Sequence, residues 1–319
     1  MAKQYLVTGA AGFIGAAVAE RLLKHGNKVV TIDNLSTGCM EHIPKGVEFI
    51  HGSTFDPQVI DQLGDRRFDA IIHIAGQSSG EISFEDPVYD LQTNCQSTLL
   101  LLNYAHKTGC KKFLYASTMS VYGDHENPEC VEATQLHPKS FYAVGKLASE
   151  HYMRIYSQQF GLACTALRLF NVYGVGQNMR NLKQGMVSIY LAMAIKDREI
   201  AVKGSKDRFR DFVYIDDVAD AFVNALTREC GYECLNICTG KRTTVEQVLD
   251  AITSRLPGKV RVTYTDGTPG DQFGIFGSNS KAKTIIQWEP RWRFEDGIAE
   301  MVDWAVRSFG TDADQKAVD

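Results

Sequence analysis

The stretch QYLVTGAAGFIG, residues 4–15, sets the fold of this chain of 319 residues. Its apolar start at residues 4–7 predicts a short strand, and a helical pattern follows at residues 16–25. Glycines between a strand and a helix allow a tight turn and let a ligand approach the backbone closely. The free N–H groups and positive dipole end of the helix then suit a pyrophosphate. The spacing is GxxGxxG rather than the general dinucleotide pattern GxGxxG, so the turn alone leaves a plain strand–helix connection open.

A second predicted strand brings an acidic residue to this turn. Residues 28–32 (KVVTI) read as the strand, which ends at Asp33, 18 positions after Gly15. A carboxylate there can accept hydrogen bonds from an adenosine ribose. It would also repel the 2′-phosphate of NADP, and no arginine follows closely, so NAD is favoured over NADP. The alternative is that Asp33 serves only the turn that it forms with Asn34.

Strands and helices alternate through the first half of the chain. This alternation predicts an α/β fold with a doubly wound parallel sheet covered by helices on both faces. Ligands of such sheets lie beyond the carboxyl ends of the strands, where Ser117, Thr118 and Tyr122 fall. After Gly174 the pattern becomes irregular, and the paired aspartates at 216 and 217 are expected to cap a helix. Further strands are predicted at residues 47–51, 67–75, 112–117, 162–168 and 235–238, helices at 90–105, 142–160, 185–194, 216–226 and 243–256, and a loop at 124–137.

Composition limits the kind of protein that this chain can be. It is 44% hydrophobic and 23% charged, as in soluble globular proteins. A net charge of −4 without a basic tract argues against nucleic acid as a partner. No apolar run approaches the ~20 residues of a membrane span, and a strand starting near Gln4 leaves no room for a signal peptide. The eight cysteines lack CxxC or zinc-ligand spacing, so we expect reduced thiols, no metal and a cytoplasmic location.

Tyr142 and Lys146 are spaced for chemistry. Residues four apart on a helix lie on the same face, so a phenol and an ammonium would meet. The cation should lower the pKa of the tyrosine from about 10 towards working pH and make it a general acid/base. A solvated surface pair is the alternative when the two are considered alone.

Several motifs together resemble one known family. TGAAGFIG (8–15), Asp33, Asn94, ASTMSVYG (116–123), the Tyr142/Lys146 pair and RLFNVYG (168–174) occur in this order. The chain resembles the extended short-chain dehydrogenase/reductases, and among them the nucleotide-sugar epimerases of the UDP-glucose 4-epimerase type, from Lys3 to about Trp304. The resemblance implies an NAD-binding Rossmann domain at residues 1–172, to which parts of 212–252 return. It also implies a smaller C-terminal α/β lobe for the substrate at 173–211 and 253–310, with a mobile tail at 311–319.

The resemblance also implies a reaction and its residues. Tyr142 would take the proton of a sugar hydroxyl while hydride moves to NAD, and a transient 4-keto sugar would turn over before both return. Lys146 would bind the nicotinamide ribose, and Thr118 would hydrogen-bond the reacting oxygen. The implied cofactor residues are Gly9, Gly12, Phe13, Ile14, Gly15, Asp33, Asn34, Ala75, Asn94, Ser117, Tyr142 and Lys146. The implied substrate residues are Thr118, Tyr142, Asn171, Arg210, Asp271 and Ile275.

The two residues after Thr118 limit the types of reaction that this chain could catalyse. Related sugar dehydratases, decarboxylases and 3,5-epimerases carry an acid, a base or a cysteine in this segment, whereas this chain has Met119 and Ser120. Epimerisation at C4 needs only Tyr142 and is therefore favoured. An NAD-linked nucleotide-sugar oxidoreductase with net redox turnover is the alternative. A non-enzymatic nucleotide sensor is a third, which the intact Tyr142, Lys146 and Thr118 set argues against.

The substrate end departs from the family pattern. The family's Arg-x-Gly-Asp is Thr268-Pro269-Gly270-Asp271 here, so diphosphate binding must lean on Arg210 and backbone donors. The resemblance implies that Asn171 also contacts the diphosphate. Arg210 could instead form a surface ion pair with Asp207 or Asp211. Ile275 stands where the family limits sugar size. We expect a nucleoside diphosphate-sugar, a UDP-sugar first, with the base and the sugar left open.

A homodimer is expected from the same resemblance. The family pairs two helices per subunit, here residues 90–105 and 142–160. Four consecutive leucines at 99–102 make the first helix apolar on more than one face, as burial against both a sheet and a partner requires. Core burial alone could explain the same pattern.

Overall fold

Seven parallel strands form the central sheet of the computed structural model, which describes residues 2–267 and 273–309. Their order is β12-β7-β5-β4-β1-β2-β3, and every neighbouring pair is parallel. This confirms the doubly wound α/β prediction. The strands are β1 (Gln4–Thr8), β2 (Lys28–Asp33), β3 (Glu48–His51), β4 (Ala70–His73), β5 (Lys112–Thr118), β7 (Ala163–Leu169) and β12 (Tyr232–Ile237).

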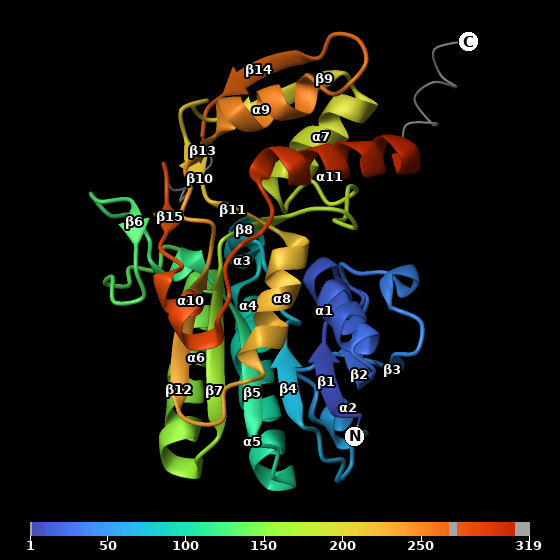
Figure 1. Ribbon diagram of the computed structural model, residues 1–319, viewed down its shortest axis with the longest axis vertical. Coiled ribbons are helices and arrows are strands. Elements are labelled where there is room, and N and C mark those ends of the chain that lie inside the picture. Colours follow the sequence, from blue (N-terminus) through green and yellow to red (C-terminus); the bar gives the residue numbers. More distant parts are fainter. Residues whose placement is uncertain (1, 268–272, 310–319) are drawn as a thin grey trace.

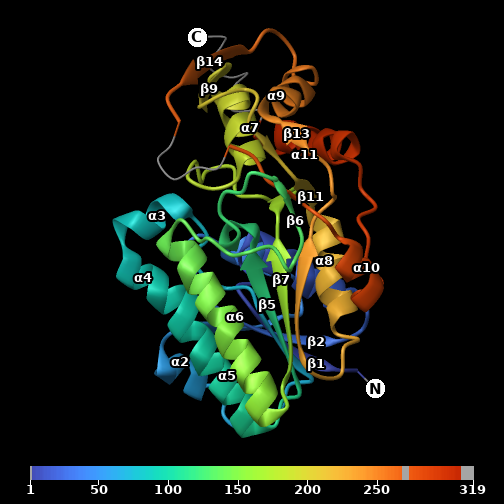
Figure 2. The same ribbon diagram turned by 90° about the vertical axis from the view of Figure 1, so that its left-hand side faces the viewer.

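Helices cover both faces of the sheet, as Figure 2 shows. Successive strand side chains point to opposite faces, so Leu6 and Val7 of β1 enter different cores. Val7 packs in the core shared with α1 (Phe13–Lys24), α8 (Ile215–Ala225) and α10 (Ser280–Ile286). Leu6 packs in the core shared with α2 (Pro57–Asp61), α5 (Ser97–Thr108) and α6 (Phe141–Phe160).

A second group of elements lies beyond the carboxyl ends of β1 and β4, in the upper part of Figure 1. It has its own apolar core, and Phe13 and Ile14 at the start of α1 pack against it. Its elements are α7 (Met186–Lys196), β9 (Glu199–Lys203), α9 (Val245–Thr253), β14 (Arg261–Thr265) and α11 (Phe294–Phe309). The chain therefore enters this group after β8 (Asn171–Tyr173), returns to the main sheet with β12 and leaves it again. The domain boundaries given above stay a prediction, and the tail at 311–319 lies outside the described residues.

The predicted loop at residues 124–137 contains a strand. β6 (Glu129–Cys130) pairs in parallel with β15 (Phe276–Gly277), and the loop prediction is wrong at these two residues. Their partner lies far along the chain, so no local pattern marks them. The remaining short elements are η1 (Met40–His42), α3 (Gly80–Glu85), η3 (Met119–Val121), β10 (Phe209–Arg210), β11 (Phe212–Tyr214) and β13 (Thr243–Thr244).

The helix predicted at residues 90–105 is longer and interrupted. It consists of α4 (Pro87–Leu91), a π-helical turn η2 (Gln92–Gln96) and α5. It begins earlier than predicted because Pro87 occupies the first turn and the Asp86 carboxylate caps the N–H of Tyr89 at 2.9 Å. The π-turn contains Asn94, one of the predicted cofactor residues, and such turns occur often at functional sites.

The expected aspartate cap of α8 is also wrong. Tyr214 is the capping residue, and Asp216 and Asp217 lie in the first turn, where the helix dipole favours negative charge. Asp217 turns inward, and its carboxylate accepts the backbone N–H groups of Arg291 at 3.0 Å and Trp292 at 3.1 Å. It thus ties the segment before α11 to α8.

Within residues 2–267 and 273–309, no helix has the length and apolar character to cross a membrane. The same residues contain no cluster of His, Cys, Asp and Glu side chains suited to a metal ion. All eight cysteines are free thiols.

Candidate active site

The glycine turn joins β1 to α1 as predicted and is built around three glycines. Gly9 adopts a left-handed φ of +80°, and its N–H donates to the carbonyl of Ile32 on β2 at 2.9 Å. A Cβ on Gly15 would overlap the carbonyl oxygen of Gly9, so the helix can pack on the turn only with glycine there. A Cβ on Gly12 would meet only Gly9 O, at 3.3 Å, among neighbouring atoms. The outer side of the turn is therefore open to a ligand.

Asp33 ends β2 beside this turn. Its carboxylate accepts the N–H of Ala11 at 2.9 Å on one oxygen and the N–H of Leu35 at 2.8 Å on the other. Each oxygen keeps a further lone pair for a hydroxyl donor. Asn34 lies next to it, and its side-chain amide donates to the hydroxyl of Ser53 at 3.0 Å. Asp33 therefore serves the local turn and can still accept from a ribose, so the two interpretations of this residue are compatible.

Tyr142 lies in the first turn of α6, against the carboxyl end of β5. Ser140 caps the helix by accepting the N–H of Ala143 at 3.1 Å. A side-chain hydrogen bond joins the phenol to Thr118, the last residue of β5. Thr118 also accepts the N–H of Ser120 at 3.1 Å, which fixes its hydroxyl at the strand end. The predicted pair of Tyr142 and Thr118 is thus brought together by the cap of one element and the end of another.

Lys146 follows on the same face of α6, buried at 3% exposure. Its Nζ donates to the carbonyl of Ala116 at 3.0 Å. It lies 4.7 Å from the ring centroid of Tyr115 and 5.8 Å from that of Tyr142. The pair is therefore buried against the sheet, and the alternative of a solvated surface pair is excluded.

The pKa values of the pair correct the expectation of an acidified tyrosine. Burial raises the pKa of Tyr142 to about 12, and the hydrogen bond with Thr118 lowers it only in part, while Asp90 raises it further. Burial lowers the pKa of Lys146 to about 8, and Asp90 opposes that shift. Desolvation outweighs the attraction between neighbours because both groups are deep in the protein. In the protein alone, Tyr142 is a neutral phenol.

Asn94 lies in the π-turn next to Lys146, with its amide held by two acceptors. Its Nδ2 donates to the carbonyl of Gln77 at 2.9 Å and to Asp90 Oδ1 at 3.1 Å. Its Oδ1 is buried and has no hydrogen-bond partner among the residues that the structure describes. A Cβ on Gly76 would lie 2.5 Å from this oxygen and 3.4 Å from Lys146 Nζ, so both atoms face the same backbone. Asp90 was missed in the sequence, although it lies one helical turn before Asn94.

Ser117 has a partner that the sequence did not reveal. Its hydroxyl donates to Glu150 Oε1 at 2.5 Å, so the side chain is already used within the protein. Glu150 forms a buried ion pair with Arg168 of β7, with Nη2 and Oε2 at 2.7 Å. The spacing Tyr142, Lys146, Glu150 at four-residue intervals is the signal that could have indicated this residue. Glu150 therefore joins α6 to the ends of β5 and β7.

The predicted substrate residues are placed less uniformly. Asn171 begins β8 and donates to the carbonyl of Asp211 at 3.3 Å. Arg210 is buried and donates to the carbonyls of Phe209 at 2.8 Å and Phe273 at 3.2 Å, so it is not an exposed surface charge. Ile275 packs in a buried apolar cluster with Val121, Tyr122, Cys130, Phe170 and Cys238. Asp271 and Thr268 lie outside the described residues.

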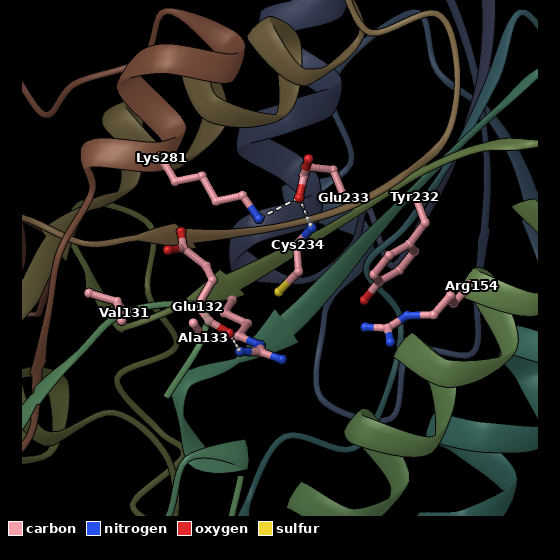
Figure 3. Close-up of a pocket in the computed structure, with 9 residues that line it drawn as sticks. Val131, Glu132, Ala133, Arg154, Tyr232, Glu233, Cys234 and Lys281 are labelled. Atoms are coloured by element: carbon pink, nitrogen blue, oxygen red, sulfur yellow. Dashed lines mark hydrogen bonds and ion pairs between the residues drawn. The ribbon is translucent and has the colours of Figure 1, made fainter. Parts of the chain in front are cut away.

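A cavity of about 440 Å³ lies apart from Tyr142, at the free edge of the sheet beside β12. Figure 3 shows Lys281 paired with Glu233 there, and Arg154 beside the ring of Tyr232. Carboxylates cap outward N–H groups of this edge strand, because Glu132 accepts from Asn236 at 2.7 Å. An edge strand with capped N–H groups is protected from pairing with another chain. None of the predicted site residues lines this cavity.

A dinucleotide fits the residues around the glycine turn, at the carboxyl ends of the central strands. The open glycine turn offers the N-terminus of α1, whose capping residue Gly12 carries no side chain to cover its N–H groups. Asp33 has lone pairs that can accept from a ribose hydroxyl. The Oδ1 of Asn94, beside Lys146, has no partner among the described residues and can accept a hydrogen bond from a bound group. These features lie along the carboxyl ends of β1, β2, β4 and β5.

Comparison with known proteins gives an independent result. The model of the NAD dependent epimerase/dehydratase family matches residues 5–238. A UDP-glucose 4-epimerase of Mycolicibacterium smegmatis is 32% identical over 305 residues, covering 94% of this chain and 97% of that protein.

Solved structures agree over nearly the whole chain. The UDP-glucose 4-epimerase of Thermotoga maritima, solved with UDP-glucose, matches with a TM-score of 0.92 and 32% identity over 96% of this chain and 99% of that one. The UDP-glucose 4-epimerase of Thermus thermophilus, solved with NAD, matches with a TM-score of 0.88 and 34% identity over 94% and 98%.

Proposed function

The chain belongs to the NAD-dependent epimerase/dehydratase family, and on that premise we propose that it epimerises a nucleoside diphosphate-sugar at C4 through a transient 4-keto sugar. The observation that carries this proposal is the convergence of Tyr142, Thr118 and Lys146 at the end of β5, beside the orphaned amide oxygen of Asn94. Residues 1–172, with parts of 212–252 returning to them, would hold NAD, and the remaining lobe would hold the sugar nucleotide.

Tyr142 is the acid/base of the proposed reaction. It takes the proton of the C4 hydroxyl during oxidation and returns it to the 4-keto oxygen after the sugar has turned. Thr118 shares the reacting oxygen by a hydrogen bond, and Lys146 holds a positive charge beside the phenol. When bound, NAD supplies the acceptor of the hydride from C4, and its oxidised ring adds a second positive charge that favours the phenolate. These contributions oppose the burial that raises the pKa of Tyr142 to about 12 in the protein alone.

The residues after Thr118 support chemistry at a single carbon. Met119 cannot exchange a proton, and the N–H and hydroxyl of Ser120 both bond to the hydroxyl of Thr118. Elimination or epimerisation at C3 or C5 would need a second acid/base. Tyr142 alone suffices for removal and return of hydrogen at C4.

The proposed substrate is a UDP-sugar. The two solved relatives described above are UDP-glucose 4-epimerases, and one was solved with UDP-glucose. Asn171 and Arg210 would bind the diphosphate, for which a guanidinium forms charge-assisted hydrogen bonds. Asp271 would hold the nucleoside ribose, and Ile275 would act on sugar size through the apolar cluster that it shares with Met119 and Leu147.

A labelled substrate tests the proposal. UDP-glucose and UDP-galactose deuterated at C4 are incubated with the purified protein, once without added NAD and once with NAD in excess of the sugar nucleotide. We expect the C4 epimer of each, with the deuterium retained at C4 and no accumulation of NADH. Stoichiometric NADH, or a 4-keto product that leaves the protein, would instead identify the NAD-linked oxidoreductase. No conversion of either UDP-sugar, nor of the GDP-, CDP- and dTDP-sugars run beside them, would reject both.

We further propose a homodimer through the α3, α4 and α6 side of the molecule (Figure 2). Large apolar side chains are at least half exposed on these helices, whereas the expected leucines Leu101 and Leu102 are fully buried in the core. An exposed apolar face of this kind marks an interaction surface. The residues that we assign to it are Phe84, Val88, Leu91, Phe141, Val144 and Ile155.

A further inference from the structure

We propose that Asp90 is a positioning residue, a buried counter-charge that keeps Lys146 cationic and orients the Asn94 amide towards the cofactor. This inference rests on the proposed function only in so far as Lys146 serves the reaction. The structure shows the contacts among Asp90, Asn94 and Gln77 and the position of Lys146 beside them, and these features do not depend on the proposed function.

Asp90 is buried at the end of α4, with 1% of its surface exposed. One carboxylate oxygen, Oδ1, accepts two side-chain hydrogen bonds, from Gln77 Nε2 at 2.8 Å and Asn94 Nδ2 at 3.1 Å. The other oxygen, Oδ2, faces Gly145 of α6, where a Cβ would lie 3.4 Å away. A buried carboxylate persists only where hydrogen bonds and opposite charge compensate the loss of water. Gln77 and Asn94 supply the hydrogen bonds, and the nearby cation is that of Lys146.

Two acceptors, Asp90 Oδ1 and the carbonyl of Gln77, also fix the direction of the Asn94 amide. Because its Nδ2 is held by Asp90 and by the carbonyl of Gln77, the amide oxygen must point the other way. There the oxygen lies against the backbone of Gly76, which Lys146 Nζ also faces. It has no hydrogen-bond partner among the described residues. A donor bound at this point, such as a ribose hydroxyl, would satisfy the oxygen. Asp90 thereby sets an acceptor and a cation side by side.

Four titratable groups of the described residues face the ammonium of Lys146, and Asp90 is the carboxyl group among them. Burial raises the pKa of Asp90, whereas the charge of Lys146 and the hydrogen bonds from Gln77 and Asn94 lower it. His73 of β4 is neutral, because burial and the nearby Lys146 lower its pKa to about 3. Tyr115 of β5 and Tyr142 of α6 are phenols whose pKa values burial raises. Asp90 raises the pKa of Lys146 against burial, which holds it at about 8. Within the described part of the chain Lys146 makes no direct ion pair, so Asp90 acts through space.

Loss of the Asp90 charge is expected to lower the pKa of Lys146. The protonated amine is the form that burial disfavours and Asp90 favours, so removal of the charge must lower the pKa of Lys146 below about 8. Lys146 would then lose its proton within the neutral range. The same change must move the basic limb of the turnover profile to lower pH.

Asp90→Asn is the decisive variant, because its side-chain oxygen can still accept from Gln77 and Asn94 while the charge is gone. The protein is purified with its cofactor content measured and matched between variants. Lysine is labelled with ¹³C at Cε, and the Lys146 signal is assigned with Lys146→Met. We expect the midpoint of the Lys146 titration to fall by about one pH unit in Asp90→Asn, an effect typical of a nearby opposite charge. Asp90→Glu, which keeps the charge, should titrate close to the parent protein.

Asp90→Ala supplies a second variant should Asp90→Asn not fold. It removes the charge together with the hydrogen bonds from Gln77 and Asn94, and the midpoint should fall in the same direction. An unchanged Lys146 midpoint in whichever variant folds would overturn the proposal and leave Asp90 as a structural tie between α4 and the loop after β4. The lysine titration needs no turnover, so an inactive parent protein would reject the proposed function without deciding this one.

Discussion

At the residue scale, burial sets the pKa values of the two groups on which the proposed chemistry depends. Tyr142 and Lys146 shift in opposite directions, to about 12 and about 8, because each favours its neutral form away from water. The two pKa values therefore move apart, each in the direction opposite to the one that a phenolate beside an ammonium requires. Positive charge brought by a bound cofactor and a second hydrogen bond to the phenol oxygen are the means by which the site can become basic.

Loss of the Tyr142 hydroxyl should abolish turnover while the fold persists. For Tyr142→Phe we expect the rate to fall by about 10²–10⁴-fold, the usual contribution of general acid–base catalysis. The fold loses only one hydrogen bond, a contribution of about 0.5–1.5 kcal/mol. The measurements are the conversion of UDP-galactose and the NAD released per mole of denatured protein.

Tyr104→Phe is the matched control, since it removes the same atom far from the site, where Tyr104 donates to the carbonyl of Arg66 at 2.8 Å. It should keep parental activity. Near-parental activity of Tyr142→Phe would contradict the mechanism, whereas loss of bound NAD in that variant would point to a binding defect.

At the scale of elements, α6 is anchored to the sheet by one buried ion pair. Glu150 and Arg168 are exposed by only 3% and 4%, and Ser117 and Arg168 supply three hydrogen bonds to the carboxylate, at 2.5, 3.0 and 2.7 Å. This places the first turn of α6 against the end of β5, where Thr118 lies. The ion pair therefore positions the residues of the proposed site.

Breaking this pair on one side should destabilise the protein strongly. Glu150→Gln leaves the Arg168 guanidinium buried without its counter-charge, and such a change costs about 3–5 kcal/mol of unfolding free energy. The measurement is the midpoint of urea unfolding at matched NAD content. Glu199→Gln breaks the exposed pair of Glu199 and Arg261 and should leave the midpoint unchanged. Equal midpoints for both variants would show that the buried pair is dispensable.

The turn between β1 and α1 makes a second prediction at this scale. Gly15→Ala places a methyl group on the carbonyl of Gly9, so α1 must move away from the turn. We expect the bound NAD per mole of protein to fall by at least about tenfold, since a displaced helix terminus no longer faces the pyrophosphate. Gly80→Ala is the control, because its Cβ would come no closer than 3.9 Å to neighbouring atoms. Full NAD content in Gly15→Ala would contradict the assignment of this turn.

At the scale of the whole molecule, the carboxyl ends of the strands meet both the proposed cofactor site and the second group of elements. The carboxyl ends of β1, β2, β4 and β5 meet the glycine turn, Asp33 and the Tyr142 helix, while the second group of elements lies beyond them (Figure 1). Ser79 of the loop after β4 donates to the carbonyl of Lys183 at 3.3 Å, and Lys183 pairs with Glu85. The main sheet and the second group of elements are therefore joined by these contacts next to the proposed site. They are also joined by the packing of Phe13 and Ile14 of α1 against the core of the second group.

The proposed dimer gives a prediction at this scale. Val144→Glu introduces a charge at the centre of the exposed apolar face and should prevent association. By light scattering, the mass should fall from twice the 35.5 kDa of the chain to a single chain. Tyr264→Glu alters a comparably exposed side chain on β14, away from this face, and should remain dimeric. A parental protein that is monomeric at all concentrations would reject the interface.

The sequence by itself determined the features that depend on neighbours along the chain. Alternating apolar strands and helices specified the parallel sheet, and the spacing of Gly9, Gly12 and Gly15 specified the turn, because steric limits act within a few residues. The four-residue spacing of Tyr142 and Lys146 placed them on one helical face.

Only the tertiary structure decided what surrounds those residues. The pairing of β6 with β15, the ion pair of Glu150 with Arg168 and the place of Asp90 beside Lys146 all depend on packing between elements. The pKa of Tyr142 rises rather than falls because burial, which exists only once the core has formed, outweighs the charge next to it. Local spacing can bring a cation to a phenol, but the packed protein around them sets which protonation state each prefers.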